Sequence, residues 1–234
     1  PKKYQATVFT IKNTIQEHGF KLDDYGNYYH LETGTIFNLI FDCERDEVII
    51  AFMGLEHHRF LSIADKEKNQ LCERSYWAAS RDWSGYDDKA SEQAINLSRR
   101  LKEIVEETDL KLVMVGHSHG GGLAQTAALA NGIQGVVFNP RPIGAATQRK
   151  IGENTLRSHA HLNTIFCVKK DWLNDSAMAN SMGSILETLG FTVPRNFGTT
   201  YYLPSVNDEH PLGSHGGFYQ SFSKLKELQE TEMS

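Results

Sequence analysis

Residues 112–122 read LVMVGHSHGGG, and this stretch decides the fold. Its apolar beginning, 112–115, predicts a buried strand, and the small residues that follow predict a helix over 121–130. Between them stands the pattern G-x-S-x-G, with Ser118 at its centre. The two glycines of this pattern let strand and helix approach closely, and the serine occupies a strained turn that exposes its hydroxyl. The stretch therefore predicts a nucleophilic serine at the carboxyl end of a parallel strand.

The composition is that of an ordinary globular protein. The chain has 234 residues, of which 40% are hydrophobic and 23% charged, and its net charge is -5. We expect a single domain over 1–234 and no nucleic-acid partner, because no basic patch stands out. Cys43 and Cys167 stand in apolar runs, which predicts buried thiols rather than a disulfide framework.

Hydrophobic periodicity indicates an α/β fold. We expect strands over 35–41, 48–53, 112–115, 135–138, 165–168 and 199–203, and helices over 8–15, 90–105, 121–130 and 218–228. A short polar turn joins the first two strands, which predicts an N-terminal antiparallel hairpin. The later strands alternate with helices, which predicts a mostly parallel central sheet with helices on both faces. The polar stretch 64–85 is interpreted as a surface excursion that rims a pocket.

Two further stretches bear on location and substrate. No apolar run reaches the roughly 20 residues of a membrane span, and no signal peptide is visible. We therefore expect a cytoplasmic location or secretion by a route without a signal peptide. Between 176 and 198, Met178, Met182 and Leu189 fall on one helical face, which predicts either a helix packed in the core or an inserted lid or acyl-binding helix.

A serine nucleophile needs a base and a group that orients the base, and in this architecture they follow in the order serine, acid, histidine. Asp171 follows the strand 165–168, and Asp175 is the alternative acid. His215 stands among small residues in the segment GSHGG, and His210 is the alternative base. We predict catalytic roles for Ser118, Asp171 and His215.

Acyl transfer also needs N–H groups that bind the developing oxyanion. The residue after the nucleophile, His119, supplies one backbone N–H. Leu55 lies just after the strand 48–53 and is predicted to supply the second. The imidazole of His119, like that of His117, is expected to line the pocket or support the site, because it stands too close to Ser118 in sequence to act as its base.

Three segments in order carry a family resemblance. Residues 51–55 (AFMGL), 116–121 (GHSHGG) and 137–144 (VFNPRPIG) resemble the AFRGT, GHSLGG and TFGxPRVG segments of the lipase class 3 branch, fungal triacylglycerol lipase-like, of the α/β-hydrolases. The branch includes bacterial phospholipase-like relatives. The resemblance implies an α/β-hydrolase fold and a serine esterase. Met53 and Leu55 depart from the pattern, as does the histidine after the serine.

The sequence thus predicts a serine hydrolase that cleaves carboxylic esters of lipids in the manner of a lipase or phospholipase A, without cofactor or metal. The expected partners are a lipid or other acyl-ester substrate and a peripheral membrane contact. An acyltransferase or thioesterase with the same residues is one alternative. A secreted antibacterial or host-directed effector, with an immunity or chaperone partner, is another, and an inactive hydrolase-fold binding module is the non-enzymatic one.

Overall fold

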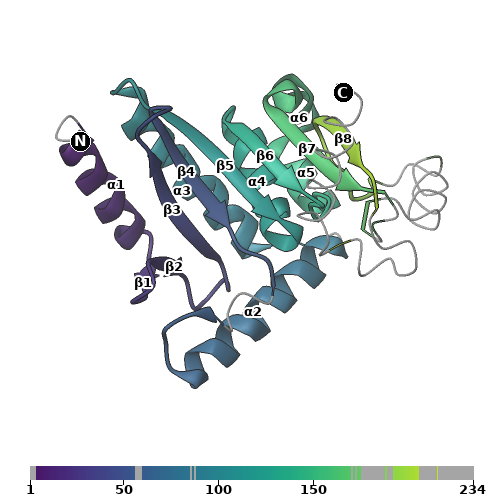
Figure 1. Ribbon diagram of the computed structural model, residues 1–234. Helices are drawn as coiled ribbons and strands as arrows, with labels where there is room; N and C mark the ends of the chain where they lie inside the picture. The colour runs from purple at the N-terminus through teal and green to yellow at the C-terminus, as the bar shows by residue number, and fades with distance from the viewer. Residues whose placement is uncertain are drawn as a thin grey trace, which may run out of the picture.

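One mixed sheet forms the centre of the computed structural model, which describes residues 4–55, 60–84, 86, 88–169, 171, 173–174, 188, 192–205 and 215. Its eight described strands lie side by side in chain order (Figure 1). They are β1 (Lys21–Leu22), β2 (Asn27–Tyr29), β3 (Ile36–Asp42), β4 (Glu47–Phe52), β5 (Lys111–His117), β6 (Gln134–Phe138), β7 (Asn163–Val168) and β8 (Thr199–Leu203).

The sheet changes direction at β4. Strands β1 to β4 pair antiparallel, whereas β4 to β8 pair parallel. This arrangement confirms the predicted α/β fold, the N-terminal hairpin and the mostly parallel sheet. Parallel strands require long crossovers, and from β4 to β7 these crossovers contain the helices α2 to α6. The carboxyl ends of the neighbouring strands β4 and β5 consequently lie side by side at one end of the sheet.

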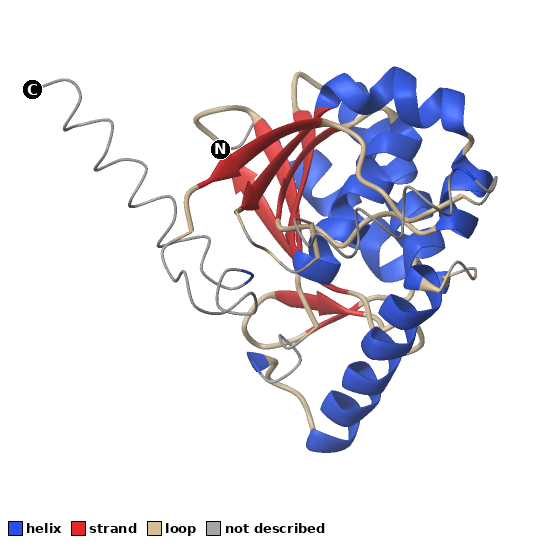
Figure 2. Cartoon of the chain, turned by 90° about the vertical axis from the view of Figure 1, so that its right-hand side faces the viewer, coloured by secondary structure: helices blue, strands red, loops and turns tan. Residues whose placement is uncertain are grey.

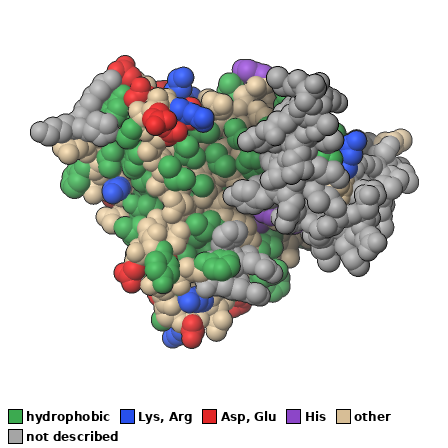
Figure 3. Space-filling model, viewed as in Figure 1, with side chains coloured by type: hydrophobic (Ala, Val, Ile, Leu, Met, Phe, Trp, Pro, Cys, Tyr) green, Lys and Arg blue, Asp and Glu red, His purple; other side chains and the backbone are tan. Residues whose placement is uncertain are grey.

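The described helices are α1 (Gln5–Glu17), α2 (Asp65–Trp83), α3 (Lys89–Glu106), α4 (Ser118–Asn131), α5 (Ala145–Ile151) and α6 (Glu153–His159), followed by the short 3-10 helix η3 (Ala160–Leu162). Figure 2 shows these described helices gathered largely on one side of the sheet, whereas the sequence predicted helices on both faces. There α3 and α4 bury Leu101 and Leu123 against Met114 and Ile50 of the strands. Figure 3 shows hydrophobic side chains at the surface over the strands on the other side.

Helix α2 replaces the predicted surface excursion over 64–85. Its buried residues are Leu71, Ser75, Ala78 and Asp82, which share one face at helical spacing. Two of these four side chains are polar, so hydrophobic periodicity could not reveal the helix. The hydroxyl of Ser75 donates a hydrogen bond of 2.6 Å to the backbone oxygen of Gly34, which fixes α2 against the turn before β3.

Two cysteine predictions had different outcomes, and two helix predictions remain untested. Cys167 is buried in β7, as predicted, but Cys43 is exposed because it follows the last residue of β3, in the turn to β4. The predicted helix over 218–228 lies outside the described residues. So does the predicted insertion helix, whose residues Met178, Met182 and Leu189 are not described.

Candidate active site

The turn at Ser118 has the strained geometry that its motif requires. Ser118 joins β5 directly to α4 and has a φ of 57°, a left-handed conformation that residues with a side chain rarely adopt. A Cβ atom added to Gly116 would lie 2.3 Å from the backbone oxygen of Gly120, and one added to Gly120 would lie 2.3 Å from the backbone oxygen of Phe52. Strand and helix can therefore meet this closely only with glycine at both positions.

Ser118, His215 and Asp171 lie in hydrogen-bonding contact. The Nε2 atom of His215 is 2.7 Å from the Oγ atom of Ser118, and its Nδ1 atom is 2.6 Å from Oδ2 of Asp171. Because a carboxylate accepts, Nδ1 carries the proton and Nε2 is the acceptor for the serine hydroxyl. The structure thus brings together the three residues predicted from the sequence. The alternatives Asp175 and His210 lie outside the described residues.

The carboxylate of Asp171 is fully buried and saturated with hydrogen bonds. Its Oδ1 atom accepts from the backbone N–H groups of Leu173 and Asn174, at 3.1 and 3.0 Å, and from the side chain of Asn174, at 2.8 Å. The Oδ2 atom faces His215. This division leaves one oxygen for the imidazole and fixes its orientation, which is what a group that holds a catalytic base must do.

Asn139 supports the histidine from the end of β6. Its Nδ2 atom donates to the backbone oxygen of His215 at 2.9 Å, and its Oδ1 atom accepts from the backbone N–H of Val168 at 2.8 Å. The same oxygen of His215 also accepts from Nε2 of His117, again at 2.9 Å. Sequence reasoning assigned no role to Asn139. One signal was present in the sequence, because Asn139 stands where the resembled pattern has glycine. Asparagine adopts a left-handed backbone more readily than most residues, and Asn139 has a φ of 40°.

A buried ion pair lies next to His119, the residue that follows Ser118. Arg141 and Asp82 are paired, with side-chain exposures of 4% and 1%. Asp82 also accepts from the backbone N–H of Gly144 at 3.0 Å and from the hydroxyl of Thr147 at 2.6 Å. Burial lowers the pKa of Arg141 to about 10, so its guanidinium is still charged at neutral pH. The carboxylate compensates a charge that burial would otherwise make very costly.

The guanidinium of Arg141 fixes the tautomer of His119. Nε of Arg141 donates to Nδ1 of His119 at 3.2 Å, and the backbone N–H of Arg141 donates to the oxygen of Ser118 at 2.8 Å. Since a guanidinium can only donate, the proton of the imidazole must be on Nε2. Burial holds the pKa of His119 below its ordinary range, more strongly than the carboxylate of Asp88 raises it. His119 is therefore neutral and buried.

Both predicted oxyanion donors stand at the carboxyl edge of the sheet. Leu55 lies just beyond the end of β4, and His119 lies in the first turn of α4, after β5. These two strands are neighbours in the parallel part of the sheet. The N-terminus of α4 also presents the positive end of the helix dipole. The placement is compatible with the predicted role of their backbone N–H groups, which remains a prediction.

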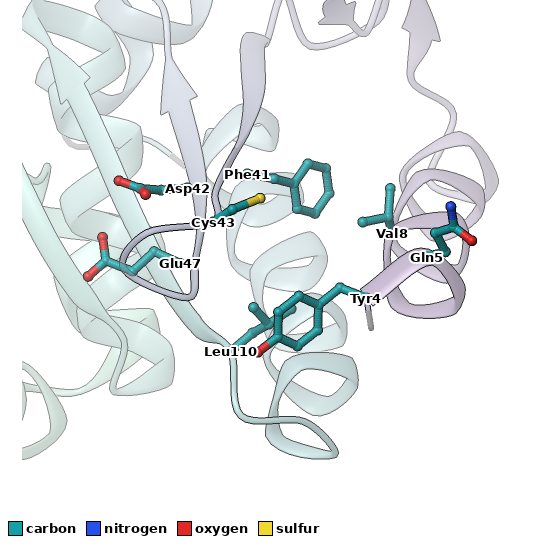
Figure 4. Close-up of a pocket in the computed structure, with 8 residues that line it drawn as sticks. All are labelled: Tyr4, Gln5, Val8, Phe41, Asp42, Cys43, Glu47 and Leu110. Carbon is teal, nitrogen blue, oxygen red and sulfur yellow. The ribbon is translucent and has the colours of Figure 1, made fainter. Parts of the chain in front are cut away.

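A cavity of about 450 Å³ lies away from Ser118 (Figure 4). Its lining includes Tyr4 and Val8 of the first helical segment, Phe41 of β3 and Leu110, which precedes β5. Ser118 follows the other end of β5, so the cavity and the serine stand at opposite ends of that strand.

Among the described residues, no group of three or more His, Cys, Asp or Glu side chains could hold a metal ion. No helix in the described ranges is long and apolar enough to cross a membrane.

Comparisons with known proteins identify the family of this chain. Residues 42–203 match a phospholipase-like family described as "Tle-like phospholipase domain". A curated relative, the extracellular phospholipase A1 of Serratia liquefaciens, is 39% identical over 79 residues, which cover 31% of this chain. The chain matches only 24% of the length of that relative. Because the family match spans most of the chain and contains Ser118 and Asp171, we conclude that the chain belongs to the family of Tle-like phospholipase domains.

Proposed function

We propose that this chain hydrolyses the carboxylic acyl esters of phospholipids as a phospholipase A-type serine hydrolase. The observation that carries the proposal is the continuous path of two hydrogen bonds, 2.7 and 2.6 Å long, from Ser118 through His215 to Asp171. Membership of a phospholipase-like family and the similarity to the extracellular phospholipase A1 of Serratia liquefaciens favour a phospholipid over other esters.

The proposed reaction uses these three side chains in two steps. Ser118 Oγ attacks the ester carbonyl while Nε2 of His215 takes its proton, and the tetrahedral intermediate then expels the alkoxide, which receives that proton. A water molecule attacks the resulting acyl-enzyme with its proton passing to His215, and the fatty acid leaves as the serine recovers its proton. Asp171 holds the imidazole in the required tautomer and stabilises the imidazolium that forms.

The backbone N–H groups of His119 and Leu55 are proposed to bind the oxyanion. Each such donor typically contributes a few kcal/mol to the transition state. Because position 55 carries leucine, the side chain there cannot add a hydrogen bond, and the proposal rests on the main chain. The order of segments supports assignment to the lipase class 3 branch of the α/β-hydrolases, in one domain over 1–234 with a lid or acyl-binding insertion at about 176–198.

Labelling with a fluorophosphonate probe tests the nucleophile. The parent protein should be labelled, whereas the Ser118→Ala variant should not be. Hydrolysis of p-nitrophenyl butyrate and of phosphatidylcholine vesicles, with products resolved by mass spectrometry, tests the reaction. Release of a fatty acid and a lysophospholipid is expected. An unlabelled parent that releases neither product would refute the proposal and favour a binding role for the domain.

A further inference from the structure

Helix α2 has an exposed stripe beside the face that it buries. Lys66, Gln70, Arg74, Trp77 and Arg81 are all exposed and follow one another at intervals of three or four residues, which places them in one row on the helix surface. We call these five residues the α2 stripe. The buried residues Leu71, Ser75 and Asp82 face the interior. Three of the five stripe residues are cations, and the exposed Glu73 stands next to them on the helix surface, which leaves an excess of positive charge there.

Tyr86 extends the stripe beyond the end of the helix. Its backbone N–H donates to the oxygen of Arg81 at 2.9 Å, and the guanidinium carbon of Arg81 lies 5.8 Å from the centre of its ring. Trp77 is 61% exposed and Tyr86 is 63% exposed. Large aromatic side chains that are this exposed and alternate with arginines do not serve the interior of the protein. They present an apolar body with a polar tip, next to cations.

The stripe lies beside the candidate active site. Figure 1 shows α2 running across the end of the sheet at which β4 and β5 terminate. Asp82, the next residue after Arg81, is paired with Arg141, and Arg141 is bonded to His119. The end of α2 that carries Trp77 and Arg81 is thus attached to the residue that follows Ser118. A surface that binds the stripe would be held close to the serine.

We propose that the α2 stripe, with Tyr86, docks the protein on the surface of an anionic phospholipid bilayer. Trp and Tyr side chains prefer the membrane–water interface, and each Lys or Arg near an anionic bilayer adds a favourable interaction with its phosphates. The charge complementarity is local, because the whole chain has a net charge of -5. The inference rests on the proposed function, since a phospholipase must reach substrate that stays within a bilayer.

A matched pair of double variants tests docking. Arg74→Gln with Trp77→Gln removes one cation and one aromatic ring from the stripe. Phe9→Gln with Lys12→Gln removes the same two kinds of side chain from exposed positions of α1. These two residues are three positions apart, as Arg74 and Trp77 are. Glutamine keeps helix propensity at all four positions. Both variants are made in a Ser118→Ala background, so that lipid is not consumed, and circular dichroism with thermal melting verifies their folding.

Cosedimentation with vesicles of phosphatidylcholine and phosphatidylglycerol in a 3:1 ratio measures docking. The Arg74/Trp77 variant should partition roughly 10- to 100-fold less than the parent, and the Phe9/Lys12 variant should match the parent. Pure phosphatidylcholine vesicles should bind the parent more weakly than the mixed vesicles. Equal partitioning of the parent and the stripe variant would overturn the inference.

Activity of the same variants with Ser118 intact separates this inference from the proposed function. The stripe variant should hydrolyse vesicle phospholipid at least ten-fold more slowly than the parent and p-nitrophenyl butyrate at the parental rate. If the parent hydrolyses neither substrate, the proposed function fails, whereas vesicle binding in the Ser118→Ala background still decides the docking inference. An equal loss on both substrates would refute docking as the role of the stripe.

Discussion

The side-chain amide of Asn139 donates a 2.9 Å hydrogen bond to the backbone oxygen of His215, while its oxygen accepts from Val168. One side chain therefore joins the end of β7, close to Asp171, to the residue that contacts Ser118. Replacing Asn139 by glycine keeps the left-handed backbone available but removes both bonds. We expect kcat for p-nitrophenyl butyrate to fall about ten-fold, the equivalent of roughly one net hydrogen bond, with KM little changed.

The Asn139→Ala variant provides the comparison. Alanine also lacks the amide, but it carries a Cβ atom at a φ of 40°. It should therefore unfold at lower denaturant concentration than Asn139→Gly, by about 1 kcal/mol in the free energy of unfolding, with a similar fall in kcat. A glycine variant with parental kcat would show that Asn139 does not position His215.

Substitution of Ser118, His215 or Asp171 should lower turnover strongly, but to different extents. Ser118→Ala and His215→Ala are each expected to lower kcat by roughly four to six orders of magnitude, because nucleophile and base act as a unit. Asp171→Asn should cost about four orders of magnitude through loss of the correct imidazole tautomer. Initial rates with p-nitrophenyl butyrate measure all three.

His210→Ala and Asp175→Asn are the controls for these assignments, since both residues follow Ser118 in the expected order. Each should retain kcat within about ten-fold of the parent. Loss of turnover in His210→Ala with activity retained in His215→Ala would reverse the assignment of the base.

Loss of the buried ion pair between Asp82 and Arg141 should lower the stability of the protein strongly. Asp82→Ala leaves the guanidinium of Arg141 buried without its carboxylate and also removes the acceptor for Gly144 and Thr147. We expect a loss of about 3–5 kcal/mol in the free energy of unfolding, measured by urea denaturation. Asp65→Ala, at an exposed position in the first turn of the same helix, should cost no more than about 1 kcal/mol.

Stability should depend on pH through His119. Burial lowers its pKa from 6.5, so the unfolded chain takes up a proton below about pH 6.5 while the folded protein does not. The free energy of unfolding should therefore decrease as the pH falls from 6.5, and this contribution should be constant above that pH. His30, whose pKa is also lowered by burial, acts in the same direction. Urea titrations at pH 7.5 and 5.5 measure the difference.

His119→Leu isolates the contribution of that histidine. At pH 7.5 the variant should be less stable by about 1–3 kcal/mol, because Nε of Arg141 loses its acceptor. Between pH 6.5 and 5.5 it should lose up to about 1 kcal/mol less than the parent does. An identical pH dependence in the two proteins would contradict burial of a neutral His119.

The sequence predicted those parts of the molecule whose physical signal is local. Apolar residues 112–115 and the glycines around Ser118 predicted β5, the turn and α4, because burial and close approach leave few other choices. The order of serine, acid and histidine led to Asp171 and His215, which the structure places in contact with one another. The strands that follow β5 were found in the same way, as short apolar runs.

Signals that depend on tertiary contacts were missed. Helix α2 buries Ser75 and Asp82, whose partners Gly34 and Arg141 come from distant parts of the chain, so no apolar period marked it. Asn139 gained its role from a backbone oxygen 76 positions away, which a local pattern cannot contain. Cys43 was wrongly predicted as buried because an apolar run continued up to the turn that exposes it.

The contact between Gly120 and the backbone oxygen of Phe52 has a consequence for how such a site changes in evolution. The backbone of the turn at Ser118 packs closely against that of β4, the strand that leads to Leu55, with no side chain between them. The spacing between the two proposed oxyanion donors is then inherited with the backbone, whatever side chain occupies position 55. Replacements at position 55 would leave that spacing intact, whereas any residue larger than glycine at position 120 would push its Cβ atom into the backbone of Phe52 and separate the two proposed donors.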